Sequence, residues 1–585
     1  MSIENREARP WYEGVTRYQW LVLLIASLGW VFDIFEGQIF VASMNEAMPS
    51  LLPEGTSPGR VDLYNNLALA SFLIGGALGG IGFGMLSDRI GRTRTMILTI
   101  LMYSLFTCLT ALSQTWWHMV ALRFLVAMGV GGEWAVASAM VAEVFPPRAR
   151  ARAGGVFHAS SVFGTFLAVA AGAVIVGNPA FGWRWGFAIG ALPALLTLWV
   201  RWKLREPERW VEARDVAKTD RAKQTGKIAD LFRRGLIRNT LVGVSLATIG
   251  LATFWGAHIY GKDLFRRWSE RPHLAQAQPR LRAAEERVRT AAADLLAGGA
   301  AVGYPQISER LESLEPDAKA ALETVLDRYF GPLERSTLEK ELPGATPQRA
   351  STLKELLQAH SGPVERRRIR EAAAGADPPT AQFLNRLLVE QAKPVEAWYL
   401  ERLPSATRKN MEQTVLKALP GEVKRSIKNW EMLGMLLVTT GGGFGLVAFG
   451  PICERIGRRR TFLFFHLGGL VSALVLFQLF ATASAGFYWV ALPIFGFLTL
   501  GMHAGYAIYF PELFPTRLRG TGGGFCFNGG RILAAPILII RGWMRDDLGL
   551  GLSLETVVSI LSLLFLLGVV FSLLGPETKG RELPD

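Results

Sequence analysis

Twelve apolar stretches, each about 20 residues long, recur along this chain of 585 residues. About 20 apolar residues are needed for a helix to cross the hydrocarbon core of a bilayer. The stretches therefore predict an all-α membrane protein with twelve transmembrane helices. Six lie near 19–44, 63–86, 95–113, 118–144, 153–176 and 185–203, and six more near 238–260, 430–453, 461–483, 487–511, 520–541 and 552–575.

The chain carries a formal net charge of +14, and the positions of its basic residues set the expected orientation. Arginines cluster directly after the second, fourth and eighth stretches, while the intervening loops carry few. Because Lys and Arg accumulate on the cytoplasmic side of a membrane, we expect both termini and the basic linker 204–237 to be cytoplasmic, in a plasma or inner membrane. No basic stripe with interleaved aromatic residues accompanies the charge, which argues against nucleic-acid binding.

Two motifs each occur twice along the chain, in the same order. GMLSDRIGRTRTM at 84–96 returns as GPICERIGRRRTF at 450–462, and EVFPPRARARAGG at 143–155 returns as ELFPTRLRGTGGG at 512–524. The two offsets, from 84 to 450 and from 143 to 512, are nearly equal. The repetition predicts two duplicated halves of six helices, an organisation typical of secondary transporters.

Six spans with short loops need only about 200 residues, so the offset between the halves requires an insertion. Residues 262–428 are rich in Arg, Glu, Ala and Leu and contain no apolar run long enough to span a bilayer. We predict a soluble helical domain there, between helices 7 and 8, on the external side and with an unknown partner. The expected division is a six-helix bundle at 1–203, the linker at 204–237, helix 7 at 238–261, the insertion at 262–428, and helices 8–12 with the tail at 429–585.

The repeated motifs resemble those of the major facilitator superfamily, over the whole chain except the insertion. The loop signature of that family appears as Gly84, Asp88, Arg89, Gly91 and Arg92, with a second copy as Glu454, Arg455, Gly457 and Arg458. Its fourth-helix pattern appears as Arg123, Phe124, Gly129, Gly131 and Gly132. REPERW at 205–210 and PETKG at 576–580 look like the sugar-porter signatures that end each half. The resemblance implies a transporter fold.

The resemblance also bears on the substrate. Where sugar porters carry paired glutamines, this chain reads FHASSVFGT and SLATIGLATFWGAHIYG. Asp33 and Glu36 resemble the acidic pair of aromatic-acid/proton symporters, except that an aspartate is usual at the second position and a glycine where Ile34 stands. NGGRILAAP at 528–536 is similar to the eleventh helix of those symporters, and sialic acid carriers are also similar. The resemblance implies proton-coupled symport of a small organic anion, with a sugar or polyol porter as the alternative.

Three acidic residues lie in the interior of the predicted membrane spans, away from their ends. Asp33 and Glu36, three residues apart, share one face of the first helix, and Glu133 lies midway along the fourth. Ionisable groups at this depth are costly and usually functional, and a carboxyl group removed from water can take up and release a proton near neutral pH. We expect one of the three to carry a coupled proton. The alternative is a structural role through hydrogen bonds to neighbouring helices.

Arg531, halfway through the eleventh stretch, is the most informative residue for the substrate. A guanidinium group keeps its charge, and its planar fork suits a carboxylate, so an internal acid or an anionic substrate must neutralise it. Asn528, one turn away on the same face, would add a polar contact. Arg123 is a further substrate candidate, and its ten-residue separation from Glu133 gives no reason to expect that the two pair.

Aromatic and histidine side chains of the tenth stretch are weaker candidates. Tyr506, Tyr509 and His503 would line the same cavity, although aromatic residues at helical spacing more often pack a core. His158 and His258 have no partner at metal-ligand spacing. The sequence therefore predicts no metal site.

A different set of charges lies at the predicted cytoplasmic ends of the helices. The resemblance implies charge pairs and helix-dipole contacts that latch the two halves in one state and break in the other. Topology alone would explain the arginines, but it would not explain the acids beside them. The set comprises Asp88, Arg89, Arg92, Glu143, Arg148, Glu454, Arg455, Arg458, Glu512 and Arg517.

The sequence carries no hydrolytic triad, nucleotide-binding loop or cofactor motif. We therefore expect neither an enzyme nor an ATP-driven pump, and no cofactor. The interpretation is a secondary transporter that moves a solute and protons by alternating access. A non-transporting sensor or scaffold, which would bind a solute without moving it and use the insertion for docking, is the alternative from another class.

Overall fold

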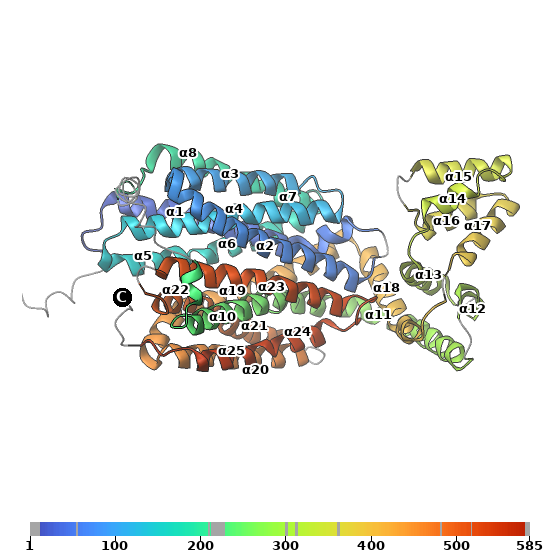
Figure 1. The fold of residues 1–585 in the computed structure, drawn as a ribbon. Helices are drawn as coiled ribbons and strands as arrows, with labels where there is room; N and C mark the ends of the chain where they lie inside the picture. The colour runs from blue at the N-terminus through green and yellow to red at the C-terminus, as the bar shows by residue number, and fades with distance from the viewer. Residues whose placement is uncertain are drawn as a thin grey trace, which may run out of the picture.

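The computed structural model describes residues 12–53, 56–208, 211, 228–298, 302–310, 314–359, 363–392, 394–479, 483–515 and 518–579. They form a long helical bundle with a separate helical lobe beyond one end (Figure 1). Eleven of the helices in these ranges are long and apolar enough to cross a membrane. With a sixth span that is broken into shorter pieces, they give the predicted twelve-span architecture.

The N-terminal half supplies the first six spans. The sixth is interrupted by a 3₁₀ turn where Gly190 lies against Thr107, since a Cβ at Gly190 would come within 2.3 Å of that side chain. Pro193, which has no backbone N–H, follows at the start of the next helix. The half comprises α1 (Arg17–Ser50), α2 (Pro58–Ile90), α3 (Arg92–Thr110), α4 (Trp116–Val144), α5 (Pro147–Ala159), α6 (Ser161–Ala171) with the π-helical turn η2 (Gly172–Val176), α7 (Gly182–Ala188), η3 (Ile189–Ala191) and α8 (Ala194–Lys203).

The C-terminal half supplies the other six spans. Its first span runs from α10 (Ile237–Gly256) through the 3₁₀ turn η6 (His258–Gly261) into α11 (Lys262–Ala297), which leaves the bundle and enters the lobe. The short η5 (Ile228–Phe232) precedes it. The remaining spans are α19 (Gly421–Ile456), α20 (Arg458–Gln478), α21 (Ala485–Leu500) with α22 (His503–Glu512), α23 (Arg519–Arg545), and α24 (Leu554–Ser562) with α25 (Leu564–Leu574).

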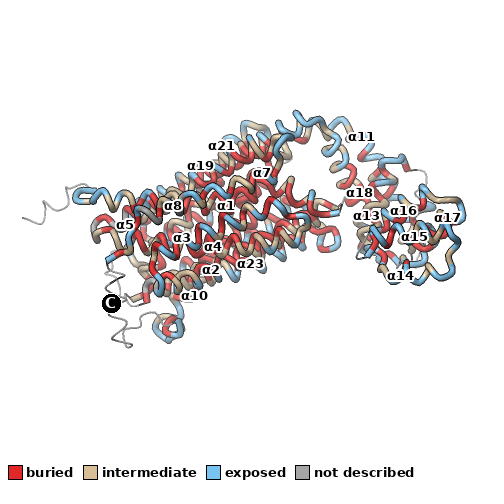
Figure 2. Tube along the Cα trace, turned by 90° about the horizontal axis from the view of Figure 1, so that it is seen from above, coloured by how far each residue is buried: buried red, intermediate tan, exposed pale blue. Residues whose placement is uncertain are grey.

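Small residues allow α2 to pack closely on its neighbours. A Cβ at Gly75 would lie 2.3 Å from the carbonyl oxygen of Phe124, and one at Gly79 would lie 2.0 Å from that of Met128. Both positions therefore admit only a glycine against α4. Figure 2 shows buried residues along the inside of the bundle and exposed or partly exposed ones along its outer surface.

The two ends of the bundle differ. At one end, α2 turns into α3 through Gly91 (φ 111°), and α19 turns into α20 through Gly457 (φ 94°). We call it the motif end, because the two copies of the loop signature lie there. The lobe lies beyond the other end (Figure 1), which we call the insertion end.

The lobe consists of short helices held on a two-helix stalk. The stalk is formed by α11 and α18, which are joined by the ion pair between Arg408 and Glu285 (2.8 Å). Between α11 and α18 (Ala397–Ala418) lie α12 (Tyr304–Arg310), α13 (Pro316–Phe330), α14 (Arg335–Lys340), α15 (Pro347–Ala359), α16 (Arg366–Gly375) and α17 (Pro378–Glu390).

A 31-residue repeat organises the lobe and was missed in the sequence. Val302, Leu333, Val364 and Val395 are spaced 31 residues apart, and they pair as two short antiparallel bridges, Val302 with Val395 and Leu333 with Val364. The same spacing relates four buried residues five positions further on, Ile307, Leu338, Ile369 and Leu400. The lobe accordingly has two cores, one from the first and fourth units with α11, the other from the second and third.

Candidate functional site

A cavity of about 130 Å³ lies between the two halves, near the middle of the bundle. The N-terminal half contributes Asp33, Gln38 and Thr165, and the C-terminal half contributes Thr439 and Arg531. Aromatic side chains form much of its wall: Trp30, Phe72, Phe254 and Trp255. The cavity thus combines an apolar wall with one acid and one guanidinium group, as expected for a site that binds a small polar organic molecule.

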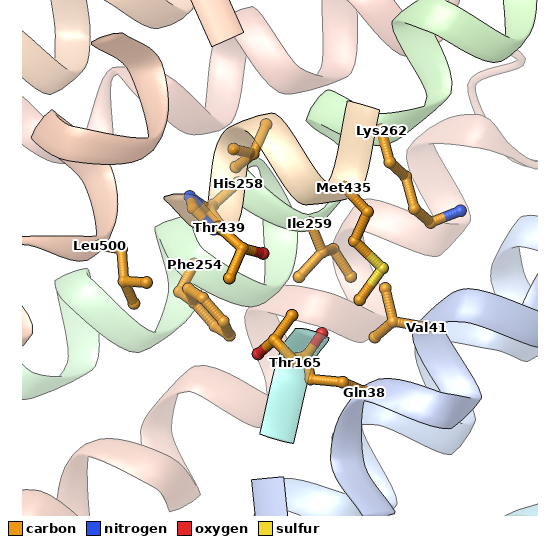
Figure 3. Close-up of a pocket in the computed structure, with 11 residues that line it drawn as sticks. Gln38, Val41, Thr165, Phe254, His258, Ile259, Lys262, Met435, Thr439 and Leu500 are labelled. Atoms are coloured by element: carbon orange, nitrogen blue, oxygen red, sulfur yellow. The ribbon is translucent and has the colours of Figure 1, made fainter. Parts of the chain in front are cut away.

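A second, smaller space of about 30 Å³ adjoins the cavity toward the insertion end. It shares Gln38, Thr165 and Thr439 with the larger space and adds His258 and Lys262 (Figure 3). The three shared residues therefore line both spaces, which lie next to one another.

Asp33 and Glu133 face one another at the edge of this site. Their side chains are almost fully buried, and within the described part of the chain none of their four carboxyl oxygens has a hydrogen-bond partner of normal geometry. Gly29 makes room for Glu133, whose Oε1 lies 2.4 Å from the place a Cβ would occupy. Asp33 also lies within electrostatic reach of Arg531. Two close carboxyl groups without donors are most stable when they share a proton.

Glu36 and Arg123 lie inside the N-terminal half rather than in the cavity. The guanidinium group of Arg123 donates a hydrogen bond to the backbone carbonyl of Glu36 (2.9 Å) and stacks on the rings of Phe72 (4.4 Å) and Phe40 (5.3 Å). Neither residue lines the cavity. Arg123 forms no ion pair with Glu133, so the two charged residues of α4 have different surroundings.

Arg531 and Asn528 project from α23 toward α2. The guanidinium group of Arg531 lines the cavity, stacks on Phe527 (4.8 Å) and lies opposite Gly76, where a Cβ would come within 3.1 Å of it. Asn528 packs in the same way on Gly80, with its Oδ1 3.1 Å from the Cβ position. In the described ranges Arg531 forms no ion pair, so its charge remains available to a ligand.

The tenth-span candidates use their polar atoms elsewhere. The Tyr506 hydroxyl donates to the backbone carbonyl of Leu246 (3.0 Å), and the Tyr509 hydroxyl donates to that of Pro576 (2.7 Å). The Nδ1 atom of His503 lies 3.2 Å from the carbonyl of Leu500. None of the three lines either space, which gives them a packing role in this state.

His158 and His258, which have no partner at metal-ligand spacing in the sequence, lie in different surroundings. His258 lines the smaller space and is hydrogen-bonded to Thr499 through Nδ1 (2.6 Å). His158 stacks on Trp30, with ring centroids 5.7 Å apart. Neither belongs to a group of residues in the described ranges that could hold a metal ion.

The charges at the motif end form the same cluster twice. In the N-terminal half, Arg92 pairs with Glu143 (2.9 Å), and Glu206 accepts hydrogen bonds from the backbone N–H groups of Arg92 (2.7 Å) and Thr93 (3.1 Å). Glu206 thus caps the first turn of α3, where the helix dipole favours an anion. Glu206 was missed in the sequence, although REPERW contains it.

The C-terminal half repeats this arrangement. Arg458 pairs with Glu512 (2.7 Å), while Glu577 accepts hydrogen bonds from the backbone N–H groups of Arg458 (3.0 Å) and Arg459 (3.2 Å). Glu577 was also missed, although PETKG repeats the glutamate of REPERW. The corresponding placement of Glu206 and Glu577 gives both signatures a physical role.

Of the other predicted gating residues, the three whose side chains the structure describes form no such pairs within the described ranges. Arg89, Glu454 and Arg455 are exposed at the motif end. The side chains of Asp88 and Arg148, and all of Arg517, lie outside the described residues.

At the insertion end, ion pairs join the two halves. Arg541 is fully buried and pairs with Asp62 (2.9 Å), which also binds Arg545 (3.0 Å), while Arg60 pairs with Asp546 (2.6 Å). These pairs were missed in the sequence because each charge lies near the end of an apolar stretch, where it resembles an ordinary loop residue. The structure is therefore closed at the insertion end.

A second group of charges closes the same end around α1. Lys428 pairs with Glu46 (2.8 Å), and Glu431 binds both Lys428 (3.2 Å) and Lys262 (2.5 Å). Asn45 donates to the carboxylate of Glu431 (3.1 Å). The cluster thus ties α1 of the N-terminal half to α11 and α19, the two helices that lead into and out of the lobe.

Comparisons with known proteins agree with this architecture. Residues 37–265 match the family model described as Major Facilitator Superfamily, and residues 431–585 match the one described as Sugar (and other) transporter. Both families are transporters rather than enzymes. The chain has the fold of a D-xylose-proton symporter, with a TM-score of 0.55 over 97% of this chain and all of that one, at 13% sequence identity.

Two curated relatives match part of the chain. A probable 4-methylmuconolactone transporter of Cupriavidus pinatubonensis is 32% identical over 41% of this chain and 54% of its own length. A sialic acid transporter of Escherichia coli is 30% identical over 39% of this chain and 52% of its own length. The chain thus spans about half the length of the curated relatives it matches.

Proposed function

The chain belongs to the major facilitator superfamily, and we propose that it is a secondary active transporter that moves a small organic anion together with protons. The observation that carries the proposal is Arg531, a guanidinium group without an ion pair in the described ranges, which lines a cavity between the halves. A carboxylate would neutralise that charge and accept two parallel hydrogen bonds from it. The sialic acid relative supports an acidic substrate.

Proton coupling is assigned to Asp33 and Glu133. They face one another, and within the described part of the chain their carboxyl oxygens have no hydrogen-bond partner of normal geometry. Asp33 also lines the substrate cavity near Arg531. Loss of the shared proton would leave Asp33 free to attract Arg531, in competition with the substrate carboxylate. Glu36, which lies with Arg123 inside the N-terminal half, is a secondary candidate that would act through α1.

Two kinds of ion pair support a mechanism of alternating access. The insertion-end pairs join the halves, whereas those in the described part of the motif end lie within one half. Opening the insertion end requires the pairs between the two halves to break. The central cavity would then be accessible from the insertion end.

We also propose an orientation of the protein in the membrane. With the motif end cytoplasmic, both termini face the cytoplasm of an inner membrane, and residues 262–428 form an external domain on the other side. Ser351 is exposed in the lobe, so a Ser351→Cys variant should react with a membrane-impermeant maleimide in intact cells. Reaction only in inverted vesicles would contradict the proposed orientation.

A sugar or polyol porter is the second candidate. The match of residues 431–585 to the sugar transporter family favours it, since that family includes carriers of neutral solutes. Arg531 distinguishes the two candidates, because a neutral sugar would leave the guanidinium charge without a counter-ion.

Uptake into proteoliposomes tests the proposal. Benzoate, sialic acid and hexose are offered with and without an inward proton gradient. Arg531→Gln should lower the uptake of the acids by about tenfold or more, and Asp33→Asn should abolish the effect of the gradient. Arg368→Gln, at an exposed arginine of the lobe, is the control and should transport normally.

Two outcomes would overturn the assignment. Hexose uptake that is unaffected by Arg531→Gln would establish the sugar porter instead. Saturable binding without flux of any of these solutes would favour a sensor that uses the lobe to bind a partner.

A further inference from the structure

Three uncharged polar side chains meet at the insertion-end part of the cavity and have no hydrogen-bond partner in the described residues. Gln38 comes from α1, Thr165 from α6 and Thr439 from α19, so both halves contribute (Figure 3). Their exposed fractions are only 7%, 9% and 5%. Buried polar groups in native proteins are normally paired, which indicates that a ligand satisfies these three.

The charge at this end is already neutralised. Lys262 lines the same space, but its ammonium group binds Glu431 (2.5 Å) and Asp263 (3.0 Å). A second carboxylate of a substrate would therefore meet no free positive charge here. A neutral group that donates or accepts hydrogen bonds fits the amide and the two hydroxyls.

We propose that the substrate is a monoanion with an uncharged hydroxyl or carbonyl group remote from its carboxylate, bound among Gln38, Thr165 and Thr439. The inference rests on the proposed anion transport and narrows its substrate class. The carboxylate binds Arg531, the apolar body lies against Phe254 and its neighbours, and the uncharged polar group satisfies the three side chains. Dicarboxylates are disfavoured because Glu431 and Asp263 neutralise Lys262.

The test compares benzoate with 4-hydroxybenzoate, which differ only in one hydroxyl group, and adds terephthalate as a dicarboxylate. Thr439→Val keeps the side-chain volume and removes the hydroxyl. Thr440→Val is the matched control, because the Thr440 hydroxyl bonds the carbonyl of Leu436 in its own helix. Loss of one hydrogen bond should lower 4-hydroxybenzoate affinity about 3- to 10-fold in Thr439→Val, while benzoate affinity stays unchanged.

The outcomes separate the inference from the function on which it rests. If wild-type protein takes up both monoacids but Thr439→Val weakens them equally, or terephthalate binds more tightly than either, the substrate class is wrong and anion transport stands. If wild-type protein takes up none of the acids, anion transport is wrong and the inference fails with it. Gln38→Leu provides a second variant with the same expected selectivity.

An independent observation concerns the lobe and the loop between α23 and α24. Asp546 in that loop pairs with Arg60 of the N-terminal half, while Asp547, the next residue, lies 3.7 Å from Arg328 and 3.7 Å from Lys409 of the lobe. Arg402 of the lobe also donates to the carbonyl oxygen of Gly549. One short loop is therefore held from both sides.

We infer that the lobe holds this loop in the position in which Asp546 binds Arg60, and so stabilises the state that is closed at the insertion end. The lobe acts through the loop rather than through the cavity. Because each added contact to one state shifts the equilibrium toward it, releasing the loop should increase the population that is open at the insertion end.

Cysteine labelling reads this equilibrium directly. In a background without the natural cysteines, Gln38→Cys reports access to the cavity from the insertion end, using an impermeant maleimide. Paired substitution of Arg328→Gln and Lys409→Gln should raise the labelling rate about threefold or more, as expected for loss of partly buried ion pairs. Arg386→Gln, an exposed arginine of the lobe, should leave the rate unchanged.

Asp547→Asn releases the same contact from the loop side and leaves the lobe intact, so it should raise the labelling rate to a similar extent. Arg60→Gln breaks the pair to the N-terminal half and serves as the positive control. Increased labelling in Arg60→Gln, with no change in Asp547→Asn or the paired variant, would overturn the inference.

Discussion

The carboxyl group of Glu133 lies against the α-carbon of Gly29, one helical turn before Asp33. Its Oε1 atom is 2.4 Å from where a Cβ of residue 29 would be. A glycine on α1 is thus the condition for the two acids to meet.

Gly29→Ala should therefore separate the acids without removing either. The added methyl group forces Glu133 away from Asp33, at a cost typical of overpacking, about 1–3 kcal/mol. Gradient-driven accumulation should fall while exchange of solute at equal proton concentration persists. Gly82→Ala, where a Cβ meets nothing within 4 Å, is the control. Normal gradient-driven accumulation in Gly29→Ala would show that the contact between the acids is not needed for coupling.

The glutamate caps of the motif end predict a pH dependence. Partial burial raises the pKa of Glu577, but the backbone N–H groups of Lys579, Arg458 and Arg459 outweigh burial and hold the pKa below its ordinary value of 4.5. A lowered folded-state pKa gives stabilisation that is complete above the unfolded value and lost as the pH falls through the folded value. Glu577→Gln should thus lower the thermal midpoint near neutral pH, and the difference from wild type should shrink below pH 4.5.

Thermal unfolding in detergent at a series of pH values measures this difference. Glu208→Gln, at an exposed glutamate of the linker, is the control and should follow wild type throughout. A Glu577→Gln difference that persists unchanged at low pH would rule out the charged cap as its source.

The buried Arg541 predicts a strong effect at the insertion end. Its guanidinium group binds Asp62, donates to the carbonyl of Gly256 (3.0 Å) and lies over the ring of Tyr260 (3.6 Å). Removing one partner of a buried pair costs about 3–5 kcal/mol, so Arg541→Gln should shift the protein toward the state open at the insertion end. Arg541→Lys retains the charge and should have a smaller effect. Cavity labelling in both variants checks the order, and equal effects would exclude the ion pair as the cause.

The two cores of the lobe predict separate unfolding. Leu338 is fully buried in the core of the second and third repeat units. Leu338→Ala should destabilise that core by about 2–5 kcal/mol and make α14–α17 sensitive to protease, while the transmembrane bundle stays resistant. Lys354→Ala, exposed on α15, is the control. Protease cleavage spread over the first and fourth units as well would show that the lobe has a single cooperative core.

The sequence could predict the spans and the duplicated halves because both depend on hydropathy and on charges repeated at a fixed offset. Asp33 and Arg531 could be selected for the same reason, since a charge within an apolar stretch is conspicuous. Their meeting in one cavity depends on how α1 and α23 pack against each other. The residue pattern of a single helix cannot predict that packing. Tyr506 and Tyr509 resembled cavity residues, but their hydroxyl groups bind backbone carbonyls that the sequence cannot place.

The repeat of the lobe escaped detection for a different reason. In each 31-residue unit only a few buried positions recur, such as the bridge residue and the one five positions later. Exposed residues between them vary freely, and charged ones dominate the composition. The fourth unit is also fused into the long helix α18, which packs on α11 as well as on the first unit.

The span that begins with α10 leads through η6 into α11, so the lobe is carried on a helix that starts inside the bundle. The 36 residues of α11 give a rod of about 54 Å at 1.5 Å per residue. A tilt of about 10° at its base would carry the far tip through about 9 Å over that length. A small movement of the helices around the cavity would thus become a larger movement of the lobe outside the membrane. A partner that holds the far end of α11 in place would oppose the rocking of α10.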